Sequence, residues 1–386
     1  MASSNDMITL TLNCLCKANT FTTQLAQSEL PLEGWACHCD SCRHTTGALC
    51  TIDATWPESR ASVDISKLKS YQFTPDYDLL FCPTCFTPMF FANKHDSAEQ
   101  LKFLTASLKN DPGNLIKITK HIFVGDTKDG GASMWLRNPN VDGEEAKRYH
   151  ARDKTENGES AEPIPYAWPF SDPSSGYEAK TDGPTTIWCK CKGVNLQWQP
   201  GSYEGVEAKQ LPWFVDPDTH KALGGMCGCE SCRLHIGEVC TWGFAELKDI
   251  SFADGREGFP DSSTKLKALV DARDPSIGTL TYFASSPDVQ RYSCSNCSAT
   301  VFYACDDRTF MVDIAMGLLE ASDGARAEGV FSWAYASAMS HLGENEGGWR
   351  HDLLRRVIKE DADWRSARGY AKNWSTLARD KAGEGS

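Results

Sequence analysis

Hydrophobic and polar positions alternate along several short segments of the chain, and this pattern predicts a mainly β protein. The clearest segments favour β-branched and aromatic residues and are bounded by Gly, Pro and Asn; they are 50–55, 101–106, 115–124 and 309–315. A period of two places every second side chain on one face of a strand. We therefore expect β-structure in both halves of the chain.

A different period marks the C-terminal region. Trp349, Leu353, Val357 and Ile358 recur at helical spacing among charged residues, which predicts an amphipathic helix from about Glu346. We expect this helix to pack on the second half of the chain; the alternative is that it binds a protein partner.

The middle of the chain, residues 137–184, shows neither period. It is polar, charged and interrupted by prolines, which is typical of a linker. Trp168 and Phe170 could still dock on a neighbouring domain, although isolated aromatic residues in linkers are usually partly exposed.

The length of the chain limits the number of domains, and its net charge limits the class of partner. With 386 residues, 41% of them hydrophobic, the chain suits two ordinary domains. The formal net charge of −13 repels phosphate backbones and disfavours nucleic acid as a partner. Because the sequence has neither a signal-peptide pattern nor an apolar stretch of roughly 18 residues, we expect a cytoplasmic or nuclear protein with no membrane segment.

Seventeen cysteines are the most informative feature. In a reducing compartment, closely spaced cysteines are metal ligands or catalytic thiols more often than disulfides. Sixteen of them form two series with the same internal order. The series are Cys14, Cys16, Cys37, Cys39, Cys42, Cys50, Cys82 and Cys85, and then Cys189, Cys191, Cys227, Cys229, Cys232, Cys240, Cys294 and Cys297. This recurrence predicts a tandem duplication, in which the second copy carries surface insertions at about 199–223 and 248–274.

Each series predicts one closed metal site. Two cysteine pairs can supply four sulfurs to one tetrahedral zinc ion, and such sites stabilise a fold rather than perform chemistry. The predicted sets are Cys14, Cys16, Cys82 and Cys85 in the first copy and Cys189, Cys191, Cys294 and Cys297 in the second. The alternative is a redox dithiol at each pair.

The Cys-x-Cys-x-x-Cys clusters predict a second zinc ion in each copy. The predicted ligands are Cys37, Cys39 and Cys42, and in the second copy Cys227, Cys229 and Cys232. Three thiolates leave a fourth position for water or substrate, which is typical of catalytic zinc. Cys50 and Cys240 could be core residues, fourth ligands or reactive thiols.

Other polar residues near the clusters are open to two interpretations. His38 could accept a proton in the pocket or lie on the surface. Arg43 and Arg233 could attract a substrate carboxylate or be solvated side chains. Cys305, outside both series, is expected in the core.

With these motifs in place, the sequence resembles the glutathione-dependent formaldehyde-activating enzyme family, which includes centromere protein V. The first copy carries Cys14-Leu-Cys16, Cys37-His-Cys39-Asp-Ser-Cys42-Arg43 with Thr46-Gly47, and Phe81-Cys82-Pro-Thr-Cys85-Phe-Thr-Pro88. The resemblance covers about 8–136 and 185–340. Phe86 and Ser298 stand where the family usually has Gly, and Gly228 replaces the His of the second motif. These departures put activity of the second copy in doubt.

The resemblance implies two tandem β-tent domains at 8–136 and 185–345, a linker at 137–184 and a helical tail at 346–386. It also implies structural zinc on each four-cysteine set and catalytic zinc on Cys37, Cys39 and Cys42, up to four zinc ions in all. The implied activity is that of a carbon–sulfur lyase acting on a thiol–aldehyde adduct such as S-(hydroxymethyl)glutathione, with glutathione and an aldehyde as partners. One scaffold can host several functions, and the competing hypothesis is a zinc-stabilised module that binds a protein.

Overall fold

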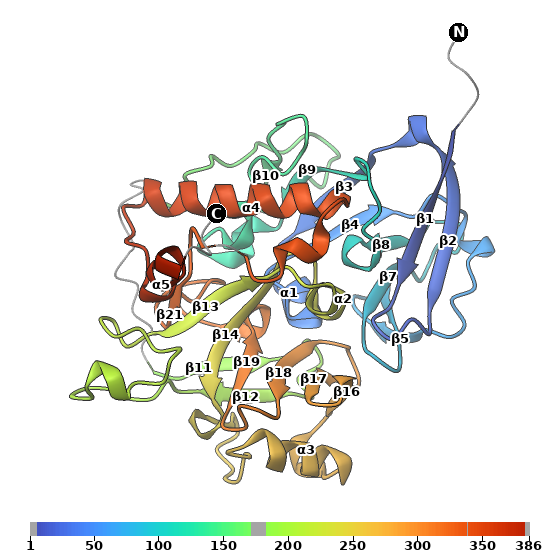
Figure 1. Ribbon diagram of the computed structural model, residues 1–386. Coiled ribbons are helices and arrows are strands. Elements are labelled where there is room, and N and C mark those ends of the chain that lie inside the picture. Colours follow the sequence, from blue (N-terminus) through green and yellow to red (C-terminus); the bar gives the residue numbers. More distant parts are fainter. Residues whose placement is uncertain (1–5, 171–182, 338, 383–386) are drawn as a thin grey trace.

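The computed structural model describes residues 6–170, 183–337 and 339–382 (Figure 1). We call residues 6–170 the N-terminal half and the remaining described residues the C-terminal half. Strands dominate both halves, and helices α4 and α5 follow near the C-terminus. The mainly β class and the C-terminal helix are therefore confirmed. In the described residues, no helix is both long and apolar enough to cross a membrane.

The N-terminal half contains a two-stranded sheet, β1-β2, and an eight-stranded sheet in the order β10-β9-β3-β4-β8-β7-β6-β5. Its elements are β1 Met7–Asn13, β2 Thr20–Ala26, β3 Leu32–Cys37, α1 Asp40–Thr46, β4 Thr51–Thr55, β5 Lys69–Gln72, β6 Tyr77–Phe81, β7 Pro88–Asn93, β8 Lys102–Leu104, β9 Ile116–Ile122 and β10 Lys147–Arg148. The strands predicted at 50–55, 101–106 and 115–124 correspond to β4, β8 and β9.

The C-terminal half contains a four-stranded sheet, β15-β12-β11-β20, and a seven-stranded sheet in the order β16-β17-β18-β19-β14-β13-β21. Its strands are β11 Thr185–Trp188, β12 Asn195–Trp198, β13 Ala222–Cys227, β14 Cys240–Glu246, β15 Ile250–Phe252, β16 Leu280–Ser286, β17 Val289–Cys294, β18 Thr300–Cys305, β19 Met311–Ala315, β20 Leu319–Glu320 and β21 Phe331–Trp333. Its helices are α2 Glu230–Ile236, α3 Ser263–Asp271, α4 Trp349–Ala367 and α5 Trp374–Ala382.

The two large sheets have the same strand order when the second is read backwards. The strands β9, β3, β4, β8, β7, β6 and β5 of one correspond to β21, β13, β14, β19, β18, β17 and β16 of the other. In both sheets the only parallel pair of this series is the first, β3 with β9 and β13 with β21. A short helix, α1 or α2, follows the strand that ends at the first cysteine of the three-cysteine motif.

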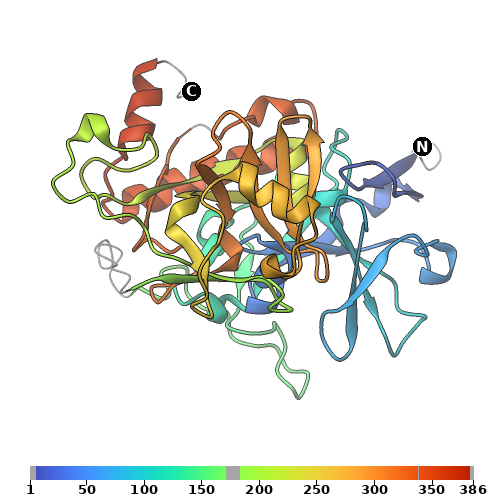
Figure 2. The same cartoon turned by 90° about the horizontal axis from the view of Figure 1, so that it is seen from below.

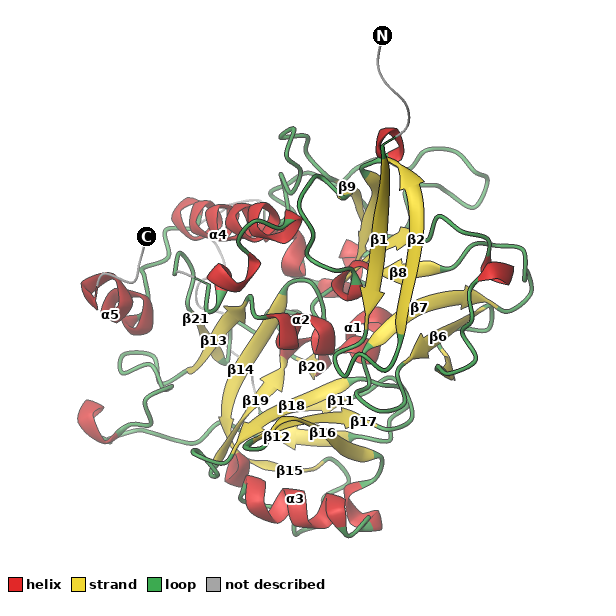
Figure 3. Cartoon of the chain, turned by 45° about the vertical axis from the view of Figure 1, so that its right-hand side comes forward, coloured by secondary structure: helices red, strands yellow, loops and turns green. Residues whose placement is uncertain are grey.

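The halves pack against each other through these short helices, which lie side by side in two views (Figures 1 and 3). The packing is reciprocal: α1 lies on the 3₁₀ turn Met316–Leu318 of the C-terminal half, and α2 lies on the 3₁₀ turn Thr105–Ser107 of the N-terminal half. A Cβ atom added to Gly47 would lie 2.5 Å from the Thr300 carbonyl oxygen, so this contact requires glycine. One hydrophobic core accordingly includes residues of both halves.

Helix α4 contacts both halves at their junction. The view from below shows the blue strands of the N-terminal half to the right of the yellow and orange strands of the C-terminal half (Figure 2). The apolar side chains of α4 are buried, as the spacing predicts, with Leu353 3% and Val357 0% exposed. The helix packs on the turn Gly131–Trp135 of the N-terminal half. Trp349 also donates a hydrogen bond from Nε1 to the Lys109 carbonyl, at 3.3 Å. The helix thus packs on the second half, as expected, and on the N-terminal half as well.

The segment predicted as a linker lies partly outside the described residues, which omit 171–182. Its described part adds β10 to the edge of the large sheet, parallel to β9. Arg148 on this strand is 2% exposed and donates hydrogen bonds to the carbonyls of Pro165 and Tyr166. Phe170 is half-buried and lies 6.0 Å from the ring of Trp364, between ring centroids.

Candidate metal centres

Each half brings four cysteine sulfurs together at one end of its sheets. Cys14 and Cys16 lie in the turn between β1 and β2, and Cys82 and Cys85 lie between β6 and β7. Their four Sγ atoms lie within 4.8 Å of one another. The sulfurs of Cys189, Cys191, Cys294 and Cys297 gather in the same way in the C-terminal half. Both predicted sets are thus assembled by the fold.

Polar groups around these sets donate hydrogen bonds to sulfur. Asn19 approaches Cys82 Sγ through its Nδ2 at 3.2 Å, and its backbone N–H approaches Cys14 Sγ at 3.3 Å. In the other half the backbone N–H of Val194 lies 3.3 Å from Cys189 Sγ. Such donors stabilise thiolate, the form of cysteine that binds metal. The arrangement suits a closed site of four sulfurs.

The residue after each Cys-x-x-Cys adopts a left-handed backbone conformation, with φ of +61° at Phe86 and +66° at Ser298. This region favours glycine because other L-residues place Cβ too close to the carbonyl oxygen. The geometry therefore gives a physical reason for the glycine that the resemblance leads one to expect there.

The three-cysteine clusters lie at strand-to-helix junctions. Cys37 ends β3, Cys39 is the N-cap of α1, and Cys42 lies in the first turn of that helix. Cys227, Cys229 and Cys232 have the same positions on β13 and α2. The sequence pattern does not reveal α1 and α2, because helices of seven residues are too short for their periodicity to be visible.

The N-termini of α1 and α2 bring the three sulfurs together and supply N–H groups that donate hydrogen bonds to them. In each cluster the three Sγ atoms lie within 4.8 Å of one another. The N-cap sulfur accepts a hydrogen bond from the backbone N–H of the third cysteine, at 3.3 Å in both halves. A helix N-terminus favours negative charge, so both junctions stabilise thiolates and fit a divalent metal ion.

His38, next to the first cluster, is buried rather than on the surface. It is 0% exposed, and its Nε2 lies 2.9 Å from Nδ1 of His121, whose Nε2 lies 2.9 Å from the Leu136 carbonyl oxygen. Since the carbonyl can only accept, His121 donates from Nε2 and accepts from His38, which fixes both tautomers. Burial lowers the pKa of His121 to about 4 and holds it neutral.

Arg43 and Arg233 are buried as well, so the interpretation of solvated side chains is wrong. They are 3% and 4% exposed. Arg43 pairs with Asp40 at 2.6 Å, and Arg233 donates to the Leu108 carbonyl of the other half at 3.2 Å. Arg233 thus joins the two halves.

The remaining cysteines lie outside the sulfur groups. Cys50 and Cys240 are 4% and 1% exposed and belong to the hydrophobic core, which confirms the core interpretation. Burial raises the pKa of Cys50 to about 12, which makes it a poor nucleophile. Cys305 is also buried, and it accepts a hydrogen bond from Arg308 Nε at 2.9 Å.

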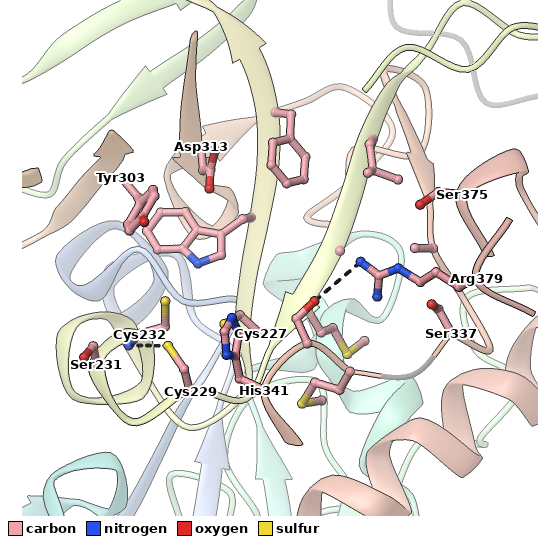
Figure 4. Close-up of a pocket in the computed structure, with 18 of the residues that line it drawn as sticks. Cys227, Cys229, Ser231, Cys232, Tyr303, Asp313, Ser337, His341, Ser375 and Arg379 are labelled. Atoms are coloured by element: carbon pink, nitrogen blue, oxygen red, sulfur yellow. Dashed lines mark hydrogen bonds between the residues drawn. The ribbon is translucent and has the colours of Figure 1, made fainter. Parts of the chain in front are cut away.

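A cavity of about 520 Å³ opens onto the second three-cysteine cluster. Figure 4 shows Cys227, Cys229 and Cys232 at one side and Ser337, Ser375 and Arg379 across from them. Arg291 of β17 also lines this cavity, and its Nη1 lies 3.5 Å from Cys232 Sγ. The motifs do not reveal Arg291, because its only sequence signal is its position three residues before Cys294.

The matching position in the N-terminal half is apolar. Leu79 stands three residues before Cys82 and pairs with Phe91 across β6 and β7, as Arg291 pairs with Tyr303 across β17 and β18. Leu79 and Phe91 form a small buried cluster with Leu104. The two halves therefore share the backbone of the three-cysteine cluster and differ at the strand position three residues before the second Cys-x-x-Cys pair.

These features define a mainly β protein with four cysteine groups that can each hold a metal ion. The sequence model of the glutathione-dependent formaldehyde-activating enzyme family matches residues 9–126, which include the first four-cysteine set and the first three-cysteine cluster. Comparisons with curated proteins and with solved structures give no match to the chain.

Proposed function

We propose that the chain is a zinc-dependent carbon–sulfur lyase acting on a thiol–aldehyde adduct such as S-(hydroxymethyl)glutathione. The observation that supports this most directly is the group formed by Cys37, Cys39 and Cys42 inside the segment that matches the enzyme family. Among the described residues this group comprises three sulfurs, while Cys50 lies apart from it in the core. Three ligands suit an ion that keeps one position for substrate.

Zinc bound there would act as a Lewis acid and would favour the thiolate form of a substrate sulfur. The N-terminus of α1 favours the thiolate form of Cys39, whose sulfur accepts the Cys42 N–H. His38, which follows Cys37 in the chain, is buried and held in place by its hydrogen bond with His121. In the lysis direction the carbon–sulfur bond breaks, the hydroxyl proton is transferred to sulfur, and the products are a thiol and formaldehyde.

We also propose that the chain carries two copies of one zinc-binding domain, at 8–136 and 185–345, with two zinc ions each. The common strand order of the large sheets and the matching positions of the cysteines support this duplication. The alternative, a zinc-stabilised module that binds a protein, lacks a specific structural observation, because the apolar side chains of α4 are already buried.

The test combines zinc content with turnover. Elemental analysis of protein purified without chelator should give four zinc ions per chain, and three in Cys39→Ala and in Cys229→Ala. Cys39→Ala should also lose formaldehyde release from S-(hydroxymethyl)glutathione, followed by NMR. Cys50→Ala is the matched control, since it removes a nearby buried sulfur outside the group, and it should keep four zinc ions. Two zinc ions in every variant, with no turnover, would overturn the proposal.

A further inference from the structure

The cavity of the C-terminal half lies outside the family-matched segment 9–126 and has chemistry of its own. Its walls come from α2, from β13, β14, β17, β18 and β19, from residues 334–337 and 339–344, and from α4 and α5. The C-terminal helices thus enclose a space above Cys227, Cys229 and Cys232. This combination of a cavity and three convergent sulfurs is the basis of the inference.

Arg291 places a positive charge beside the sulfurs. Its side chain is buried, its Nε donates to Ser285 Oγ at 3.0 Å, and its guanidinium lies over the Tyr303 ring at 5.2 Å. Within the described residues Arg291 forms no ion pair with a carboxylate, and Cys232 is the thiol it contacts. A buried arginine normally has a partner of opposite charge. Here the available partner is the negative charge of the sulfur cluster and its ligand.

Arg379 of α5 adds a second positive charge across the cavity from the sulfurs, where it donates to Ser340 Oγ at 3.5 Å. The remaining ionisable groups of the cavity leave the charge of Arg291 in place. Arg308 is neutralised by Asp313, at 2.9 Å. Asp361 of α4 is 3% exposed, and burial raises its pKa to about 8, so it is mainly uncharged at neutral pH. His341 and Glu344 pair with each other near the mouth, at 3.1 Å.

The rest of the lining is largely apolar and aromatic. Trp213, Trp242, Phe244, Met226 and Met339 line the cavity, and Trp213 is 55% exposed. Aromatic rings and methionine side chains favour an apolar body, and about 520 Å³ is within the usual range for a small-molecule site.

We propose that this cavity binds a thiol with an apolar body, whose sulfur, as thiolate, completes the coordination of a metal ion held by Cys227, Cys229 and Cys232. Arg291 stabilises the added charge: three thiolates and a divalent ion carry a net charge of −1, and a fourth thiolate makes it −2. Leu79, at the matching position of the N-terminal half, offers no such charge. The inference shares with the proposed function only the assumption that the three-cysteine clusters hold metal.

The test uses full-length protein loaded with cobalt, whose thiolate charge-transfer absorption reports ligand binding directly. Benzyl mercaptan is the probe, benzyl alcohol is its oxygen analogue, and metal content is measured for every variant. Benzyl mercaptan should give a saturable new band, and benzyl alcohol should not. Arg291→Leu should weaken binding by at least about tenfold, because a close charge in a partly buried site is lost. The matched control, Arg355→Leu, changes an exposed arginine of α4 outside the cavity and should bind as wild type.

Two further variants assign the response to one cluster. Cys229→Ser should abolish it, and Cys39→Ser should leave it. If Arg291→Leu does not fold or loses metal, the decisive pair is Arg291→Lys against Arg291→Gln, of which only the lysine variant should keep the affinity. Equal affinity in the decisive pair, or a response that disappears in Cys39→Ser alone, would overturn the inference. Loss of adduct lysis in Cys39→Ala, with the thiol response intact, would separate the two proposals.

Discussion

The two three-cysteine clusters have one backbone design and two different surroundings. In each, a strand ends at the first cysteine, the second caps a short helix, and the third donates its N–H to the capping sulfur. Beside the first cluster lies neutral, buried His38, and the strand position that matches Arg291 holds Leu79, which pairs with Phe91. Beside the second lie Arg291, Tyr303 and a cavity.

The comparison separates the residues that would bind the metal ion from the residues that would determine which small molecule binds beside it. Sulfur placement follows from local backbone geometry, so the short motif is sufficient to reproduce it. Charge and space come from side chains on β17, β18 and α4, which are distant in sequence. Gly228 is part of this difference, since a Cβ atom there would lie 3.1 Å from Met339 Sδ. Gly228 occupies the position of His38. Because glycine has no side chain, Met339 of the cavity wall can pack against it.

The largest effect is expected where the halves are most alike. Cys82→Ser and Cys294→Ser should each remove one metal ion and unfold the half concerned, because a structural zinc ion contributes about 10 kcal/mol or more of folding free energy. Circular dichroism and metal content measure this. Cys305→Ser, which lies outside the sulfur groups, should stay folded with its metal. A folded Cys82→Ser protein with its full metal content would contradict the structural role.

The next effect concerns the joint between the halves. Arg350 of α4 and Glu238, which follows α2, are 0% and 1% exposed in their side chains and pair at 2.6 Å. Arg350 also donates to the Thr105 carbonyl of the N-terminal half. Glu238→Gln leaves an unpaired buried charge and should lower the free energy of unfolding by about 3 to 5 kcal/mol.

Urea unfolding followed by tryptophan fluorescence measures this cost. Lys359→Ala is the control on the same helix, because it breaks an ion pair with Asp363 whose side chains are 72% and 61% exposed. It should not change the unfolding midpoint. A Glu238→Gln protein as stable as Lys359→Ala would show that this buried pair does not stabilise the fold.

The contrast also shows what the sequence could predict. The β-class, the strands at β4, β8, β9 and β19 and the amphipathic α4 follow from periodicity, and the four sulfur groups follow from spacing. Helices α1 and α2 were too short to be visible in the pattern. The burial of His38 and Arg233 depends on contacts with residues more than 80 positions away along the chain, which local patterns do not encode. The contact between Arg291 and Cys232 is likewise not encoded locally, because it depends on how the strands pair.

A pH dependence is expected from the C-terminal half. The pKa of Asp361 is raised from 3.8 to about 8 by burial. Because the folded-state pKa is the higher one, the folded protein binds more protons between these values, and stability falls as pH rises through the window. Asp361→Asn should remove this fall and stabilise the protein at pH 8 by on the order of 2 kcal/mol.

Thermal unfolding at about pH 5 and pH 8 tests the sign. Asp363→Asn, an exposed position two residues along the same helix, should leave the pH profile as in wild type. An Asp361→Asn profile that runs parallel to that of wild type would contradict the buried, protonated state of Asp361, because other groups titrate in the same window in both proteins.

The smallest effect lies at the turn after each Cys-x-x-Cys, where both halves use a non-glycine residue with positive φ. Ser298 is 1% exposed, and within the described residues its hydroxyl has no hydrogen-bond partner. Ser298→Gly relieves a backbone cost of about 1 to 2 kcal/mol, offset by about 0.5 to 1 kcal/mol of chain entropy, so it should stabilise the protein by about 0.5 to 1 kcal/mol. Phe86→Gly should instead destabilise it, because Phe86 is 7% exposed and its burial outweighs the strain. Urea unfolding measures the change in the free energy of unfolding for both variants. Opposite signs would show that the turn is strained in both halves and that packing compensates for the strain only in the first. Stabilisation by both changes would instead show that the packing of Phe86 does not outweigh its strain.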